Sequence, residues 1–99
     1  MMSIWKNSIC DIYYRSGGND LDDTGYEIRL TDNELVISYE NEAGWVNYKG
    51  MDLGHGHYLL TAPAVNGRAF IHHLENSDIL EGSWEEGGEQ GMWRIHLLP

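Results

Sequence analysis

The feature that most constrains the fold is a series of short runs in which apolar and polar residues alternate. Clusters of Gly, Asn and Asp separate these runs, and no segment keeps an apolar period of 3.6 residues for three turns. Alternation with period two is the pattern of half-buried antiparallel strands. About eight such runs follow one another. The sequence therefore predicts one all-β domain over residues 1–99, either a small antiparallel up-and-down β-barrel or a curled sandwich, with little or no helix.

The register of the second and third hairpins can be predicted by asking which turn sets apolar residues against each other. A two-residue turn at Asp32-Asn33 places Ile28 opposite Ile37, and the next connection places Ile37 opposite Tyr48. A slip of one residue would turn this apolar set to the wrong face. Trp45 then points outward, where a large rigid side chain is a common anchor for a binding partner.

The hairpin between residues 55 and 74 contains Asn66-Gly67, a dipeptide that favours a type I′ turn because both residues accept positive φ. A turn centred on this dipeptide pairs Leu60 with His73 and Thr61 with His72. Both faces of this pair carry apolar residues, so its orientation stays open.

The last hairpin has a loop of two or four residues that we expect to be centred on Gly88-Glu89. This loop places Trp84 opposite Trp93 and Gly82 opposite Ile95 on the buried face. The solvent face then carries Glu81, Glu85, Arg94 and His96.

Residues 16–25 are expected to form the one long polar loop. Asp20, Asp22 and Gly25 match positions 1, 3 and 6 of the calcium-binding loop of EF-hands, but position 12 is Thr31, where a bidentate Glu is required. The flanking segments are strands in this prediction, not helices. A turn-rich acidic loop is therefore favoured over a calcium site.

The charge of the chain is its strongest global signal, with sixteen acidic and six basic residues and a formal net charge of −10. Such a surface repels phosphate, which argues against nucleic acid and anionic membranes as direct partners. It favours a cation or a basic protein surface, while the simpler interpretation is that the charge keeps a small domain soluble. The first hypothesis is accordingly a small acidic binding protein of inhibitor or immunity type that binds a basic protein.

The residues expected to contact such a partner, or a ligand, are one outward tryptophan and acidic residues in or beside the predicted loops. They are Trp45, Asp20, Asp22, Asp23, Glu85, Glu86 and Glu89.

Two histidines, His55 and His57, stand two residues apart, a spacing that puts both on one face of a strand. In the predicted register His72 could lie on the same face of the neighbouring strand. These three residues are the candidate metal ligands, and a small His-based metal-binding protein or enzyme is a further hypothesis. The competing interpretation is that His55 and His57 are loop-edge residues flanked by glycines that permit a bend.

No residue pattern indicates a particular chemical reaction. There is no Ser-His-Asp or Cys-His arrangement, and Cys10 stands in an apolar run, where a core role is favoured over a nucleophilic one. The acidic tract of residues 85–91 follows no phosphate-loop pattern. Enzyme activity stays undecided, with a non-catalytic role favoured, and no cofactor is predicted.

No apolar run approaches the roughly 18 residues of a membrane span, and the first residues lack the pattern of a signal peptide. The lone cysteine cannot form an internal disulfide, which fits a cytoplasmic protein. The sequence leaves a homodimer open.

Gly-Ser-Trp at residues 82–84 and Gly-Met-Trp at residues 91–93 resemble strands of the calycin barrels, the lipocalins and avidins. The resemblance covers only this last hairpin. It implies an eight-stranded up-and-down barrel, and it supports, as the alternative function, the binding of a small apolar molecule.

Overall fold

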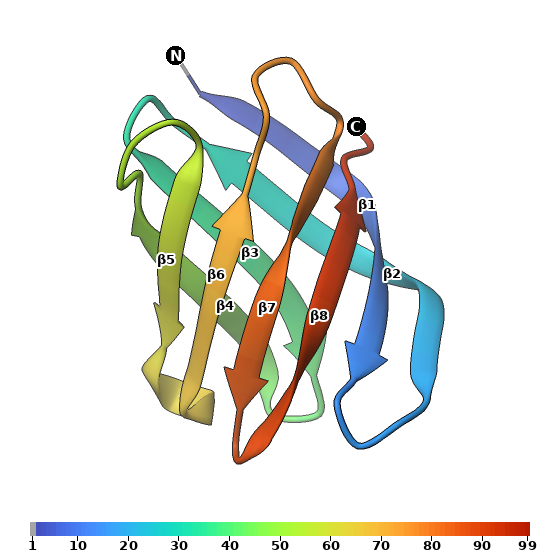
Figure 1. The fold of residues 1–99 in the computed structure, drawn as a ribbon. Helices are drawn as coiled ribbons and strands as arrows, with labels where there is room; N and C mark the ends of the chain where they lie inside the picture. The colour runs from blue at the N-terminus through green and yellow to red at the C-terminus, as the bar shows by residue number, and fades with distance from the viewer. Residues whose placement is uncertain (1) are drawn as a thin grey trace.

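The computed structural model describes residues 2–99, which form eight antiparallel strands that pair in sequence order (Figure 1). β1 also pairs with β8, so the sheet closes into a barrel. This confirms the predicted up-and-down barrel over the curled sandwich. The strands are β1 (Ser3–Tyr14), β2 (Asn19–Leu30), β3 (Glu34–Asn41), β4 (Gly44–Met51), β5 (His57–Ala62), β6 (Gly67–His72), β7 (Ile79–Glu86) and β8 (Glu89–His96).

The helical content of residues 2–99 is a single 3₁₀ turn, η1 (Pro63–Val65), between β5 and β6. No helix in this part of the chain combines the length and apolar character needed to cross a membrane.

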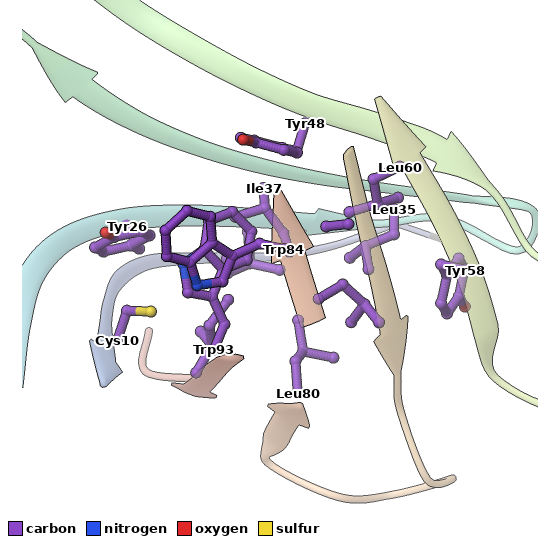
Figure 2. Packing of buried hydrophobic residues seen from close by; sticks show 14 of the residues in the cluster. Cys10, Tyr26, Leu35, Ile37, Tyr48, Tyr58, Leu60, Leu80, Trp84 and Trp93 are labelled. Atoms are coloured by element: carbon purple, nitrogen blue, oxygen red, sulfur yellow. The ribbon is translucent and has the colours of Figure 1, made fainter. Parts of the chain in front are cut away.

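The barrel interior is filled by the inward-facing residues of all eight strands, as expected for a barrel of this size. Figure 2 shows that the interior has two parts. Tyr26, Trp84 and Trp93 lie on one side, whereas Leu35 and Leu60 lie on the other, which is mainly aliphatic but also contains Tyr58. The aliphatic part is the conventional core, and the aromatic part extends toward one end of the barrel.

The register predicted for β2, β3 and β4 is confirmed. Ile28 lies opposite Ile37, and Ile37 lies opposite Tyr48, with all three side chains fully buried. Trp45 points outward as predicted, with 55% of its surface exposed. The alternation of apolar and polar residues was sufficient to predict this register, because a shift by one residue would have exposed the apolar side chains.

The register predicted for the last hairpin is wrong by two residues. The turn is Gly87-Gly88, and both residues have positive φ, 57° and 91°, as a type I′ turn requires. Trp84 therefore lies opposite Gly91, and Trp93 lies opposite Gly82. An even shift keeps each residue on its predicted face, so both indoles are still buried.

Neither glycine opposite the indoles has room for a side chain, and the contact between Gly91 and Trp84 bears directly on this register. A Cβ atom on Gly82 would overlap the carbonyl oxygen of Phe70, and one on Gly91 would overlap that of Tyr13. The same Cβ on Gly91 would approach Cε2 of Trp84 to 2.9 Å. The indole of Trp84 thus occupies space that a side chain at position 91 would need, whereas a side chain at position 82 is excluded by the backbone of β6.

The register predicted for β5 and β6 is also wrong. Instead of a type I′ turn at Asn66-Gly67, the chain forms η1, which begins with Pro63 and ends with Asn66 in the left-handed conformation at φ 53°. Ala62 then faces Gly67, and Leu60 faces Ala69 rather than His73. Proline at the first helical position favours this longer connection, because its φ is already suited to a helical turn.

The long polar loop predicted at residues 16–25 is mostly strand. β2 starts at Asn19, and its pairing with β1 has three register shifts. In the two shifts nearest the start of β2, β2 advances by three residues while β1 advances by two, which makes each of them a β-bulge. Asp22 and Gly25, with φ of 57° and 85°, lie at these bulges. Bulged strands interrupt simple alternation, so the pattern of this segment resembled a loop.

Substitution of Gly82 by Ala should lower the free energy of unfolding by about 1–3 kcal/mol, because the new methyl group overlaps the backbone of β6. Ser83→Ala is the matched control, since Ser83 is exposed and its change should stay within about 0.5 kcal/mol. Urea unfolding followed by tryptophan fluorescence measures both values. Equal unfolding midpoints for the two variants would contradict the close packing of β7 against β6.

Candidate functional site

One end of the barrel is hollowed to a volume of about 490 Å³. In Figure 1 this is the lower end, where the β1–β2, β3–β4 and β7–β8 connections lie. We call this hollow the acidic mouth. Its lining residues come from β1, β2, β3, β7 and β8 and from the last turn: Ile12, Tyr14, Asp20, Asp23, Tyr26, Tyr39, Glu40, Trp84, Glu86, Gly87, Glu89 and Trp93.

The wall of the acidic mouth is aromatic. The rings of Trp84 and Trp93 stack with centroids 6.1 Å apart and an interplanar angle of 23°, and Tyr14 meets Trp84 edge-on at 5.7 Å. These geometries are the ones that aromatic pairs favour. On the other side of the stack, Tyr48 packs edge-on against Trp93 with ring centroids 5.0 Å apart. The ring of Tyr48 in turn stacks with that of Tyr39, at a centroid distance of 6.5 Å.

The ring series ends at Tyr26, whose centroid lies 5.7 Å from that of Tyr39. Five of the six aromatic residues in this series, all except Tyr48, line the acidic mouth.

Glu86 and Glu89 reach the mouth through the alternation of the last hairpin. They lie opposite each other beside the turn, two residues beyond Trp84 and Gly91, on the same inward face. The inward face of a strand that is apolar in the core therefore becomes acidic at the rim.

Asp20 and Asp23 reach the mouth by a different route. They are three residues apart, so plain alternation would point them in opposite directions. The bulge at Asp22 compensates, because it leaves Asp20 opposite Ile12 and Asp23 opposite Cys10, both on the inward face of β1.

Tyrosine hydroxyls hold three of the rim carboxylates in place. Tyr39 and Tyr48 both donate to Oε1 of Glu86 at 2.6 Å. On the opposite wall, Tyr14 donates to Asp20 at 2.7 Å and Tyr26 donates to Asp23 at 2.9 Å. Hydrogen bonds to charged acceptors are stronger than neutral ones, so these contacts fix the positions of the carboxylates.

The surroundings keep these phenols protonated. The hydrogen bond to Asp20, with partial burial, raises the pKa of Tyr14 to about 12. Burial, followed by the hydrogen bond to Glu86, raises the pKa of Tyr39 and of Tyr48. Burial is also the main cause that raises the pKa of Tyr26. At neutral pH all four hydroxyls therefore act as donors to the rim.

One of the aromatic residues that line the mouth carries an unpaired donor. Nε1 of Trp84 is buried and has no hydrogen-bond partner among the residues described, although Trp84 is only 7% exposed. Buried polar groups without partners are few in folded proteins. Trp84 lines the acidic mouth, so this unpaired donor belongs to a residue of the mouth wall.

The structure brings together four of the seven residues predicted to contact a partner, namely Asp20, Asp23, Glu86 and Glu89. The other three lie outside the lining of the mouth. Asp22 is exposed, and its backbone N–H donates to Asp11. Glu85 accepts a hydrogen bond from Gln90 on the outer surface. Trp45 lies on β4, opposite Glu40 of β3.

Sequence reasoning missed Tyr14 and Glu40 as parts of this site. Tyr14 is the last residue of β1, and its inward direction follows from alternation with Ile12. That signal was present in the sequence, but the predicted loop at residues 16–25 separated Tyr14 from its partner Asp20.

The structure brings together two of the three predicted metal ligands. His57 and His72 are direct cross-strand partners on the outside of β5 and β6, whereas His55 lies in the turn before β5 with φ 55°. Within residues 2–99, no group of three His, Cys, Asp or Glu side chains is arranged to hold a metal ion.

A second hollow, of about 500 Å³, lies over the outer surface of β1, β6, β7 and β8. Exposed Tyr13, Phe70 and Met92 form its apolar part, and Arg15 and Arg68 stand among its polar residues. We call it the outer groove. Its two arginines give it an electrostatic character unlike that of the acidic mouth.

Cys10 is a core residue, as predicted, and is fully buried. Burial, with the nearby carboxylates of Asp23 and Asp11, raises the pKa of its thiol to about 12. A thiol of this kind is not a nucleophile at neutral pH, because the reactive form is the thiolate.

Comparison of the chain with protein-family models, with curated proteins and with solved structures found no match. The closed eight-stranded antiparallel barrel is compatible with the calycin-like fold that the two Gly-x-Trp segments resemble.

The raised tyrosine pKa values predict a loss of stability at alkaline pH. Above about pH 10 the unfolded chain releases phenolic protons that the folded chain keeps, so the free energy of unfolding falls as pH rises. The contribution of these tyrosines to stability is complete below about pH 10. It is lost as the pH rises through their higher pKa values in the folded protein. Tyr48→Phe should make the decline shallower, as measured by urea unfolding at several pH values. Parallel declines for wild type and variant would contradict the assignment.

Proposed function

We propose that this protein is a binding protein that holds an organic cation in the acidic mouth. One observation carries the proposal: five carboxylates and five aromatic rings line a single hollow, and no Lys, Arg or His is among its described lining residues. Ligand sites are usually concave, with an apolar wall and a few placed polar groups.

The aromatic wall and the acidic rim act on the same kind of ligand. A cation over the face of a Trp or Tyr ring is attracted by the ring quadrupole, with about 0.5–2 kcal/mol per contact depending on desolvation. The wall supplies Trp84, Trp93 and Tyr39 for such contacts, while Glu86 and Glu89 supply full negative charges at the entrance. A protonated or quaternary amine with a small apolar body satisfies both.

The arrangement is also organised in advance. Glu86 is held by two tyrosines, and Asp20 and Asp23 by one each, so these carboxylates do not have to be ordered when a ligand arrives. Groups that are already positioned lose less entropy on binding. The net charge of −10 adds a long-range field that attracts cations and raises their association rate.

An uncharged apolar ligand, which the calycin resemblance implies, is less well supported. The aliphatic part of the interior is occupied by buried side chains such as Leu35, Leu60 and Leu80. The hollow that remains at the barrel interior is the mouth, and an uncharged ligand there would desolvate carboxylates such as Glu86 without compensating them.

Choline and its uncharged isostere 3,3-dimethylbutan-1-ol provide the test, because they differ by one positive charge. We expect choline to bind at least about tenfold more tightly in isothermal titration, which corresponds to about 1.4 kcal/mol. Glu89→Gln should weaken choline binding by about twofold to fivefold, since it removes one rim charge.

The matched control is Glu75→Gln, which makes the same change in the β6–β7 loop at the opposite end of the barrel. It should leave the affinity for choline unchanged. Equal affinity for choline and the alcohol, or an equal effect of the two glutamate variants, would overturn the proposal.

A basic protein partner remains the second candidate, and the position of Trp45 favours it. Trp45 is 55% exposed and lies directly opposite Glu40, a residue of the mouth. A partner that inserts a basic side chain into the mouth would meet this indole beside the entrance, and exposed tryptophans often dominate the energy of such contacts.

For this candidate, a basic protein partner is first isolated at low salt. Trp45→Ala should weaken the binding of this partner by tenfold or more, while the affinity for choline stays unchanged. Affinity measurement of the purified partner against both proteins gives the result. Full retention of the partner by Trp45→Ala would remove this candidate without affecting the choline proposal.

A further inference from the structure

The side chains of His57 and His72 make a direct contact that the acidic mouth does not explain. Their Nδ1 atoms lie 2.8 Å apart, and their rings meet at 89° with centroids 4.6 Å apart. Both side chains are exposed, at the start of β5 and the end of β6. Figure 1 places these strand ends at the opposite end of the barrel from the acidic mouth.

At this distance the two ring nitrogens share one proton, so that one Nδ1–H donates to the lone pair of the other Nδ1. The lone pair of each neutral ring is directed toward the same small region between them. A metal ion that replaces the shared proton would find two imidazole ligands already facing it.

The distance between the two Nδ1 atoms is close to the spacing of two nitrogen ligands on one metal ion. Bonds of about 2.0–2.1 Å from a metal ion to imidazole nitrogens put two adjacent ligands about 2.9 Å apart at a right angle and about 3.3 Å apart at a tetrahedral angle. The observed 2.8 Å separation reaches these values by a small rotation of either ring, and exposed rings are free to rotate.

The surrounding charge favours a cation here too. Glu81 on β7 is the direct cross-strand partner of His72, and Arg94 on β8 lies one strand further away, opposite Glu81. The chain as a whole carries −10, which raises the local concentration of cations.

The other three histidines have different surroundings. His73 bonds through Nε2 to the carbonyl oxygen of Ser77 at 2.8 Å, and His96 lies 3.5 Å from a carboxylate oxygen of Asp11. His55 lies in the turn that precedes β5.

We propose that His57 and His72 form a two-histidine site for a divalent transition-metal ion that prefers imidazole, such as Zn²⁺ or Cu²⁺. Water completes the coordination, because no third protein ligand converges on the pair within residues 2–99. The bound ion joins β5 to β6 at their free ends. The site is separate from the acidic mouth and does not depend on the function proposed for it.

Titration of the whole protein with Zn²⁺ alone tests the proposal. Isothermal titration should give one ion per chain, and NMR should show the ring signals of His57 and His72 shifting together. His57→Ala and His72→Ala should each weaken the binding at least tenfold, since each removes half of the protein ligands.

Two controls separate this site from other ways of binding Zn²⁺. His55→Asn keeps a residue that tolerates the left-handed conformation, and it should leave the affinity unchanged. The double variant Glu86→Gln with Glu89→Gln removes carboxylates of the mouth and should also leave it unchanged. The proposal is overturned if wild-type protein binds no Zn²⁺, or if the histidine variants bind as tightly as wild type.

Discussion

The structure depends on a reciprocal arrangement in the last hairpin, in which each of two stacked indoles lies opposite a glycine. Trp84 faces Gly91 and Trp93 faces Gly82, and neither glycine can accept a side chain without overlapping a neighbouring strand. The large rings therefore occupy the interior while the strands remain close together. A third glycine, Gly67, likewise leaves room for a large ring, because a Cβ there would overlap the ring of Tyr48. Ring packing of this kind stabilises the fold beyond the apolar area that it buries.

The interior that results has two parts with different roles. The aliphatic part contributes the apolar burial that a chain of this length needs to remain folded. The aromatic part opens at the acidic mouth, where inward positions carry Glu86, Glu89, Asp20 and Asp23 instead of apolar residues. Inward carboxylates stabilise a fold less than apolar residues would. Hydroxyl donors such as Tyr48 offset part of that cost, and a bound cation would offset more. Sites of this kind often reduce stability in favour of function.

Much of the fold could be predicted from the sequence, because alternation identifies strands and their faces wherever the backbone is regular. The pairing of Ile28 with Ile37 followed from the apolar pattern alone. The pairing of Trp84 did not, because an even shift keeps both indoles buried and apolar pattern cannot distinguish the two registers. The observed register sets a glycine opposite each ring, and Gly91 is required there by the closeness of the Trp84 ring. The repeated Gly-x-Trp spacing contains this register, because two such segments running antiparallel pair each Trp with the Gly of the other.

The candidate site was less accessible to sequence reasoning. Four of its carboxylates were named in advance from charge and position, but not their convergence. Asp20 and Asp23 share a face only because of the bulge at Asp22, and a bulge adds a residue without a distinct sequence pattern. His57 and His72 were expected on one face of neighbouring strands, but their direct pairing was missed, because it depends on the length of the β5–β6 connection.

The most direct test of the central claim, that the mouth holds a cation, is the measurement of intermolecular NOEs between the methyl protons of bound choline and the protein. The account predicts NOEs to the ring protons of Trp93 and Tyr39, which line the mouth and not the outer groove, together with a shift of the Trp84 indole N–H signal. NOEs to Phe70 and Met92 in the outer groove, with the indole signals unchanged, would contradict it.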